Sequence, residues 1–191
     1  MELEEIIRSV CPMSDEGLEL ARRILTPRKV SARKLLVRPG EVSRELYVIK
    51  DGIARNFSTY DDKETTRWFG LPGDVMGEMF SFVHEKPAAC AIESVTDMDL
   101  LVADRADVHN LINSSPEWAL WTSRYLIDGL YQIERRFVYL GQGDAYTRYQ
   151  NLQEYRTFEV LNKIPLQQIA SYLNITPQTL SRIRRKICRN R

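Results

Sequence analysis

The spacing of hydrophobic residues changes twice along the chain. Residues 1–26 carry apolar residues at helical spacing, and Ser14 is placed to cap a helix that ends before Pro27. From about residue 30 to residue 102 the apolar runs are short and separated by turn residues, which is typical of β-strands. The helical spacing then returns and continues toward the C-terminus. The pattern predicts an α+β protein in which helices flank one all-β region.

Turn signals divide the β region about every 10 to 12 residues. They are Pro39-Gly40, Asp51-Gly52, Asp61-Asp62 and Pro72-Gly73-Asp74. Such spacing suits an antiparallel barrel or sandwich with one core.

The segment that follows the β region predicts a long helix, with Ser115 as N-cap and Pro116 at the first helical position. Apolar residues along it alternate at four- and three-residue spacing, as in a coiled-coil seam, which predicts a homodimer. The alternative is a helix that packs on its own β region, and one helix could serve both roles. Gly141 and Gly143 then interrupt the helix and set the predicted boundary between residues 1–140 and 141–191. The seam residues are Leu126, Leu130, Ile133, Phe137 and Leu140.

The segment IPLQQIASYLNITPQTLSRIRRKI predicts two short helices joined by a tight turn at residues 174–176. The hydroxyl of Thr176 can cap the second helix, and Pro177 suits its first position because no N–H is needed there. The small Ala170 allows the two helices to cross closely. This arrangement is a helix-turn-helix.

At about 100° per residue, the second of these helices has one apolar face and one basic face. Arginine can donate two bonds to guanine and glutamine can pair with adenine, so we expect Gln178 and Arg182 to read bases. We expect Arg185, Lys186 and Arg189 to contact phosphates. The alternative is a solvated basic face on a terminal helix. The predicted apolar face is Leu180, Ile183 and Ile187, and the predicted DNA-binding set is Thr176, Gln178, Thr179, Ser181, Arg182, Arg185, Lys186 and Arg189.

The distribution of charge supports this prediction although the total does not. The net charge of the 191-residue chain is only +1, which by itself argues against nucleic acid as a partner. From Thr176 onward, however, there are six Lys and Arg residues and no Asp or Glu. Positive charge is therefore concentrated where a groove-binding helix needs it.

Composition excludes several classes of protein. Hydrophobic residues make up 43% and charged residues 28% of the chain, no apolar run approaches the roughly 18 residues of a membrane span, and the chain does not begin like a secretory signal. We therefore expect a cytoplasmic protein without a membrane partner. Cys11, Cys90 and Cys188 lack metal-ligand or disulfide spacing. With only His84 and His109, no P-loop and no Gly-x-Ser-x-Gly motif, we expect neither an enzyme nor a bound cofactor or metal.

Five stretches, taken in order, point to one family: RPGE, LYVIKDGIAR, GDVMGE, SVTDMDLLV and IASYLNITPQTLSRIRRKI. Together they resemble the Crp/Fnr family of transcription regulators over essentially the whole chain. The resemblance implies an antiparallel β-roll of the double-stranded β-helix (jelly-roll) type, like a cyclic-nucleotide-binding domain. It further implies a dimerisation helix at about residues 115–140, and base reading by Gln178 and Arg182.

The chain departs from the cyclic-AMP-binding members of that family at the phosphate. Those members carry a small residue after the Gly-Glu pair and, later, an arginine with a hydroxyl neighbour. Here Gly77 and Glu78 are present, but Phe80 stands where the small residue would be, and residues 87–89 are Pro-Ala-Ala where the arginine and its neighbour belong. Burying an anion without a cation is costly, so we expect no physiological binding of cyclic AMP and expect Glu78 to be a turn residue. The pocket could instead hold an apolar or aromatic ligand. The alternative is that the aromatic side chains near it only pack in the core. The candidate effector residues are Trp68, Gly77, Glu78, Met79, Phe80, Ala88 and Ala89.

The sequence therefore predicts a homodimeric, sequence-specific transcription regulator that binds a pseudo-palindromic site on double-stranded DNA. An unknown small-molecule effector and RNA polymerase are candidate partners. The chain ends shortly after the recognition helix, so we expect no β-hairpin wing. The alternative is an effector-sensing or protein-interaction module that has lost specific DNA binding, which the near-neutral net charge and the missing wing favour.

Overall fold

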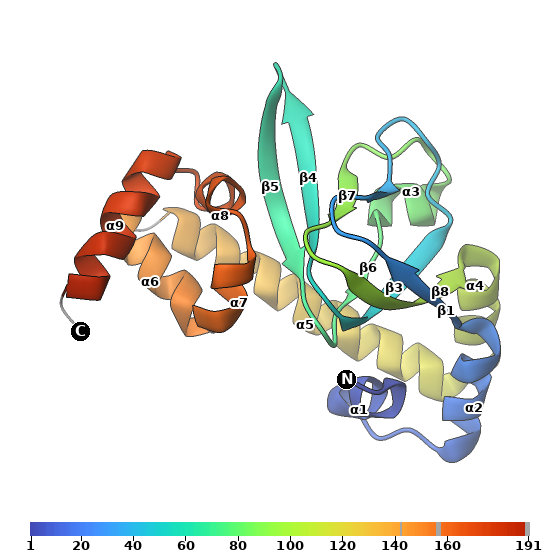
Figure 1. Cartoon of the computed structure of the whole chain (residues 1–191). Helices are drawn as coiled ribbons and strands as arrows, with labels where there is room; N and C mark the ends of the chain where they lie inside the picture. The colour runs from blue at the N-terminus through green and yellow to red at the C-terminus, as the bar shows by residue number, and fades with distance from the viewer. Residues whose placement is uncertain (142, 156–157, 190–191) are drawn as a thin grey trace. The chain divides into compact units, whose positions relative to one another are not determined.

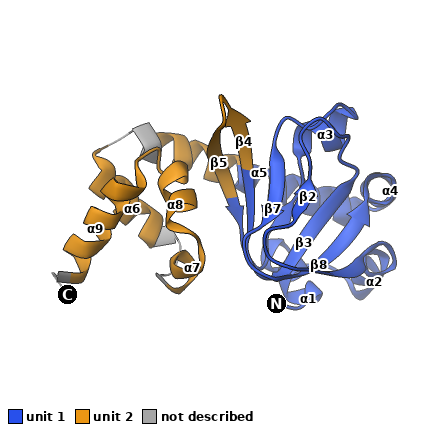
Figure 2. Cartoon of the chain, turned by 45° about the horizontal axis from the view of Figure 1, so that its top comes forward, with its two compact units in different colours: residues 1–56, 69–129 blue, residues 57–68, 130–191 orange. Residues whose placement is uncertain are grey.

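The computed structural model describes residues 1–141, 143–155 and 158–189, and these form two compact units (Figure 2). Unit 1 comprises Met1–Asn56 and Phe69–Gly129, and unit 2 comprises Phe57–Trp68 and Leu130–Arg191. The two units group residues that lie close together in space and do not test the predicted domain boundary at 140/141, which stays a prediction. None of the described helices is both long and apolar enough to cross a membrane.

Two helices precede the β region of unit 1, α1 (Leu3–Val10) and α2 (Asp15–Ile24) (Figure 1). The hydroxyl of Ser14 accepts a 3.0 Å hydrogen bond from the backbone N–H of Gly17, so the predicted cap is confirmed. Helix α2 ends slightly earlier than expected, because strand β1 already begins at Thr26 and includes Pro27.

The β region is a roll of two four-stranded sheets, with strand orders β1-β8-β3-β6 and β2-β7-β4-β5. Strand β8 pairs with β1 and β3, β6 pairs with β3, and β7 pairs with β2, each time antiparallel, as expected. The strands are β1 (Thr26–Val30), β2 (Leu35–Val37), β3 (Glu45–Asp51), β4 (Ala54–Tyr60), β5 (Lys63–Gly70), β6 (Val75–Met76), β7 (Ala91–Ser94) and β8 (Met98–Asp104).

Alternation along the strands separates the roll interior from an outer face. On β3, Tyr47 and Ile49 belong to the buried core, whereas Leu46 and Val48 point to the other side of the sheet. The core residues are Val37, Tyr47, Ile49, Ala54, Met76, Ala88, Ile92, Met98, Leu100 and Val102.

Each predicted turn adopts the left-handed backbone that its residues tolerate. The turn glycines Gly40, Gly52 and Gly73 have φ of 88°, 92° and 98°, and Asp61 and Asp62 have φ of 48° and 57°. Two successive residues with positive φ form the tight hairpin turn that fits the twist of β4 and β5. At Gly52 a Cβ would lie 2.3 Å from the carbonyl oxygen of Asp97, so a side chain cannot be accommodated there.

Helices α3 and α4 and the first part of α5 complete unit 1, and of these the sequence spacing predicts only α5. Helix α3 (Met79–His84) has six residues, and α4 (Arg105–Ser114) begins directly after β8, with Asp104 as its cap. Helix α5 (Pro116–Gly141) starts where predicted, and the hydroxyl of Ser115 accepts a 3.4 Å hydrogen bond from the N–H of Trp118.

Aromatic residues of α5 attach this helix to the rest of unit 1. The indole N–H of Trp118 donates to the carbonyl of Gly17 at 2.9 Å, and that of Trp121 donates to the carbonyl of Ile7 at 2.8 Å. The hydroxyl of Tyr125 donates to the carbonyl of Val75 and accepts from its N–H, at 3.1 and 2.7 Å. Burial raises the pKa of Tyr125 to about 12, so this hydroxyl stays protonated at neutral pH.

Unit 2 contains helices α6 (Ala145–Tyr155), α7 (Phe158–Lys163), α8 (Leu166–Tyr172) and α9 (Pro177–Arg189), the last part of α5 and the hairpin tip at residues 57–68. Apolar side chains from all four helices form its core. They include Tyr149, Leu152, Leu161, Ile164, Ile169, Ala170, Leu173, Leu180 and Ile183.

A buried ion pair joins two strands of unit 1, and composition gave no sign of it. The guanidinium of Arg55 on β4 lies 2.7 Å from the carboxylate of Glu93 on β7, and the side chains are only 5% and 18% exposed. Removing one partner of such a pair leaves a charge in a poorly solvated site.

We expect Glu93→Gln to lower the free energy of unfolding by about 3–5 kcal/mol, measured by urea denaturation. The matched control is Glu19→Gln, which breaks an ion pair with Arg22 in which both side chains are about half exposed, and which should cost less than about 1 kcal/mol. Equal losses for the two variants would contradict this assignment.

Candidate nucleic-acid interface

Helices α8 and α9 form the predicted helix-turn-helix geometry. Ile169 on α8 and Leu180 on α9 are fully buried, and Ile183 is 8% exposed. Ile187, expected on the same apolar face, is half-buried. The apolar face of α9 thus packs against the rest of unit 2, and the opposite face carries the exposed side chains.

The turn between the two helices is fixed by backbone hydrogen bonds. Asn174 has φ of 52°, and the N–H of Ile175 donates to the carbonyl of Ala170 at 3.0 Å. Arg148 of α6 donates to the carbonyl of Leu173 at 3.1 Å. Sequence reasoning missed Arg148, because its role depends on a contact 25 positions away along the chain.

Thr176 caps α9 as expected. Its hydroxyl accepts a 3.1 Å hydrogen bond from the N–H of Thr179, and the hydroxyls of the two residues are 2.9 Å apart. The Thr176 hydroxyl therefore caps the first turn of α9, and the Thr179 hydroxyl lies beside it.

The accessible face of α9 gathers four of the eight predicted DNA-binding residues around one shallow surface depression. Gln178, Arg182 and Arg185 are exposed and Ser181 is half-exposed; with Pro177 they line the depression, which contains no acidic side chain. The first turn of the helix also has no acidic residue. The face is thus positively charged and carries the donors that base edges and phosphates accept.

Three other basic residues of α9 differ in their surroundings. Lys186 is exposed, with its ammonium 5.3 Å from the ring centre of Tyr146. Arg184 donates to the hydroxyl of Tyr149 at 3.0 Å and so stabilises unit 2. The side chain of Arg189, predicted to contact phosphate, lies outside the described part of the structure.

The predicted dimer seam on α5 is exposed. The side chains of Leu126, Leu130, Ile133 and Phe137 are 53%, 58%, 48% and 74% accessible. The side chain of Leu140 is outside the described part. The same helix also exposes Leu120, Ile127, Tyr131 and Val138.

The tip of the β4–β5 hairpin is bonded to the first helix of the helix-turn-helix. The hydroxyl of Ser171 on α8 accepts from the N–H of Thr66 at 2.9 Å and donates to the carbonyl of Glu64 at 3.0 Å. Arg136 of α5 donates to the carbonyl of Thr66 at 3.1 Å, and its guanidinium lies 4.4 Å from the ring centre of Tyr172. Burial lowers the pKa of this guanidinium from its ordinary value.

The candidate effector residues have differing environments. Glu78 is buried and caps α3, its carboxylate accepting from the N–H of Ser81 at 2.8 Å, which agrees with the expected turn role. Ala88 is buried in the roll core, and its N–H and carbonyl bond to Glu41 and Gly40. Phe80 is half-exposed, 5.2 Å from the ring of His84.

The other four candidate effector residues differ too. Adding a Cβ to Gly77 would bring it within 2.5 Å of Leu46, and Ala89 is exposed. Met79 lines an apolar cavity. Trp68 lies on β5 in unit 2.

A comparison with protein-family models identifies residues 27–115 as a cyclic nucleotide-binding domain. The sequence matches no curated protein. Similar solved structures include FixK2 from Bradyrhizobium japonicum, with 17% identity and a TM-score of 0.74 over 87% of this chain and 86% of that one.

Two further structures cover even more of the chain. The c-di-GMP-responsive regulator CLP of Xanthomonas campestris has 17% identity and a TM-score of 0.73 over 93% of both chains. A putative Crp/Fnr-family transcriptional regulator from Eubacterium rectale has 16% identity and a TM-score of 0.70 over 96% of this chain and 89% of that one. Residues 27–115 therefore match the cyclic nucleotide-binding domain family, and the chain shares its fold with these solved structures.

Proposed function

We propose that this protein is a homodimeric transcription regulator that reads a pseudo-palindromic DNA site with helix α9. The observation that carries the proposal is the accessible, acid-free face formed by Gln178, Ser181, Arg182 and Arg185 on a capped helix whose opposite face is buried. Gln178 and Arg182 would contact base edges, and Arg185, Lys186 and Arg189 would contact phosphates.

The exposed seam of α5 supports the dimer. A contiguous apolar stripe on a helix is costly in water, and the heptad-like spacing fits a second copy of the same helix. A two-fold dimer would present two α9 helices to half-sites about 34–36 Å apart, one turn of DNA.

The hairpin tip offers a route by which the β-roll could affect DNA reading. Strand β4 begins in unit 1 and strand β5 ends in it, while the tip between them is bonded to α8 through Ser171 and to α5 through Arg136. A shift of either strand would move the backbone groups that hold α8. Because of the family match, we take the β-roll as the candidate sensor. Cyclic AMP is not the proposed effector, because residues 87–89 contain no arginine to bind its phosphate.

We expect selection from random DNA duplexes to enrich a sequence with dyad symmetry. Arg182→Ala should lower affinity for the selected duplex by about 10- to 100-fold, because a two-bond contact to guanine is lost, as measured by fluorescence anisotropy. The control Lys29→Ala removes an exposed charge on β1 and should leave affinity unchanged. Failure to enrich any sequence would favour the alternative, a sensing or protein-interaction module that binds DNA only through phosphates.

Phe137→Asp should convert the dimer to a monomer, since it places a charge in the apolar seam, and native mass spectrometry reads this directly. Tyr60→Asp is the matched control, because Tyr60 is 81% exposed but lies on the hairpin rather than the seam. A dimer that survives Phe137→Asp unchanged would show that α5 does not form the interface.

Ser171→Ala removes both hydrogen bonds to the hairpin tip and leaves the buried Thr66 N–H without its partner. We expect it to destabilise unit 2 by about 1–3 kcal/mol and to speed amide hydrogen exchange at Thr66. The control Ser9→Ala removes a single hydroxyl bond to the carbonyl of Ile6. Unchanged exchange at Thr66 would contradict the proposed link.

A further inference from the structure

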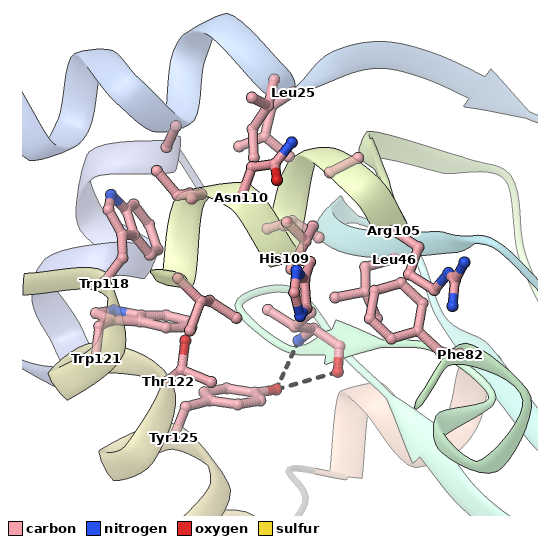
Figure 3. Close-up of a pocket in the computed structure, with 18 of the residues that line it drawn as sticks. Leu25, Leu46, Phe82, Arg105, His109, Asn110, Trp118, Trp121, Thr122 and Tyr125 are labelled. Atoms are coloured by element: carbon pink, nitrogen blue, oxygen red, sulfur yellow. Dashed lines mark hydrogen bonds between the residues drawn. The ribbon is translucent and has the colours of Figure 1, made fainter. Parts of the chain in front are cut away.

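Unit 1 contains an apolar cavity of about 670 Å³, of which the predicted sites included only Met79 and Leu126. Its floor is the outer face of the β1-β8-β3-β6 sheet, formed by Leu46, Val48 and Ala103. Residues of α1, α2, α3, α4 and α5 form its walls (Figure 3). Pockets for small molecules commonly measure about 300–1,000 Å³, so the volume suits such a ligand.

This cavity is separate from the interior of the roll. Along β3, Leu46 and Val48 face the cavity, whereas Tyr47 and Ile49 face the core between the sheets. Side chains of one strand alternate between its two faces, so the cavity and the core lie on opposite sides of the sheet.

The indole and phenol groups of α5 that line the cavity already use their polar atoms within the protein. The indole N–H groups of Trp118 and Trp121 bond to Gly17 and Ile7, and the Tyr125 hydroxyl bonds twice to Val75. The rings of Trp121 and Tyr125 are stacked with centres 5.1 Å apart. A group that lies against these rings must be apolar, since a buried polar group without a partner is costly.

The charged lining residues are Arg105 and Glu85, whose side chains meet at 2.6 Å and are 26% and 58% exposed. Figure 3 shows Arg105 beside Phe82, across the cavity from the two indoles, with His109 between. Ion pairs in such exposed positions contribute little, so a ligand carboxylate can take the place of Glu85 at low cost. Arginine matches a carboxylate with two parallel hydrogen bonds.

A small molecule fits this cavity better than a second copy of the chain. The volume is enclosed by helices on several sides and ends at a cation, whereas the exposed seam of α5 offers a partner helix only apolar side chains. Leu126 is the one residue shared by the predicted seam and the described cavity lining.

We propose that this cavity binds a fatty-acid-type ligand, with its carboxylate at Arg105 and its alkyl chain against Trp118 and Trp121. Binding itself does not depend on DNA reading. Only the role of such a ligand as effector depends on the proposed function.

The test uses the full chain with Trp68→Phe, which leaves Trp118 and Trp121 as the tryptophans that report binding. Decanoate, titrated below its critical micelle concentration in the absence of DNA, should change their fluorescence saturably and bind about tenfold more tightly than 1-decanol. Because no DNA is present, failure here leaves the proposed regulator untouched.

Variants locate the site. Arg105→Gln should weaken decanoate about tenfold and leave 1-decanol unchanged, whereas Lys29→Gln should change neither. Ala106→Phe, at an exposed position of the lining, should weaken both ligands at least about tenfold because it fills the mouth. Thr122→Phe serves the same purpose if Ala106→Phe fails to melt cooperatively.

Three results would overturn the proposal. The first is the absence of saturable binding, and the second is equal binding of decanoate and 1-decanol. The third is a shift of the ligand-free protein from dimer to monomer on Ala106→Phe in native mass spectrometry, which would identify the occupant as a second copy of this chain.

Discussion

The attachment of α5 to unit 1 by three aromatic side chains is the constraint on which the rest of that unit depends. Each ring buries its apolar surface and satisfies its one polar group with a backbone carbonyl of a different element: α2 for Trp118, α1 for Trp121 and β6 for Tyr125. Because the acceptor of each bond is a main-chain carbonyl, the three side chains of α5 fix the backbone positions of α1, α2 and β6. The helices are thereby held above the sheet, and the space between them remains open as the apolar cavity.

The local features of the chain could be predicted from its sequence. Ser14 and Thr176 form caps, the Asp61-Asp62 and glycine turns adopt positive φ, and α5 begins at Pro116, because each depends on a few adjacent residues. Helix α3 was missed because six residues are too few to show a helical period. The predicted apolar face of α9 is confirmed at Leu180 and Ile183, which are buried. It could be predicted because buried residues recur at the regular spacing of a helix.

Features that join distant segments could not be predicted in this way. The bond between Thr66 and Ser171 spans 105 positions, and nothing near either residue marks it. The same is true of the Arg55–Glu93 pair and of Arg148. The aromatic spacing of Trp118, Trp121 and Tyr125 along one side of α5 was visible in the sequence and could have indicated a buried stripe. Its hydrogen-bond partners, and hence the cavity, required the fold.

The assignment of the hairpin tip to unit 2 bears on how such proteins could be recombined. Residues 57–68 are encoded between segments of unit 1, yet they supply the backbone groups that hold Ser171 and Arg136. A gene fusion cut at 140/141 would join helices α6 to α9 to a hairpin from another protein, whose backbone groups need not match Ser171 and Arg136. A transfer of unit 2 into another protein would therefore have to include two separate segments of the sequence, the hairpin tip and the C-terminal helices. Substitutions in the hairpin must remain compatible with α8, although the two segments lie far apart in the sequence.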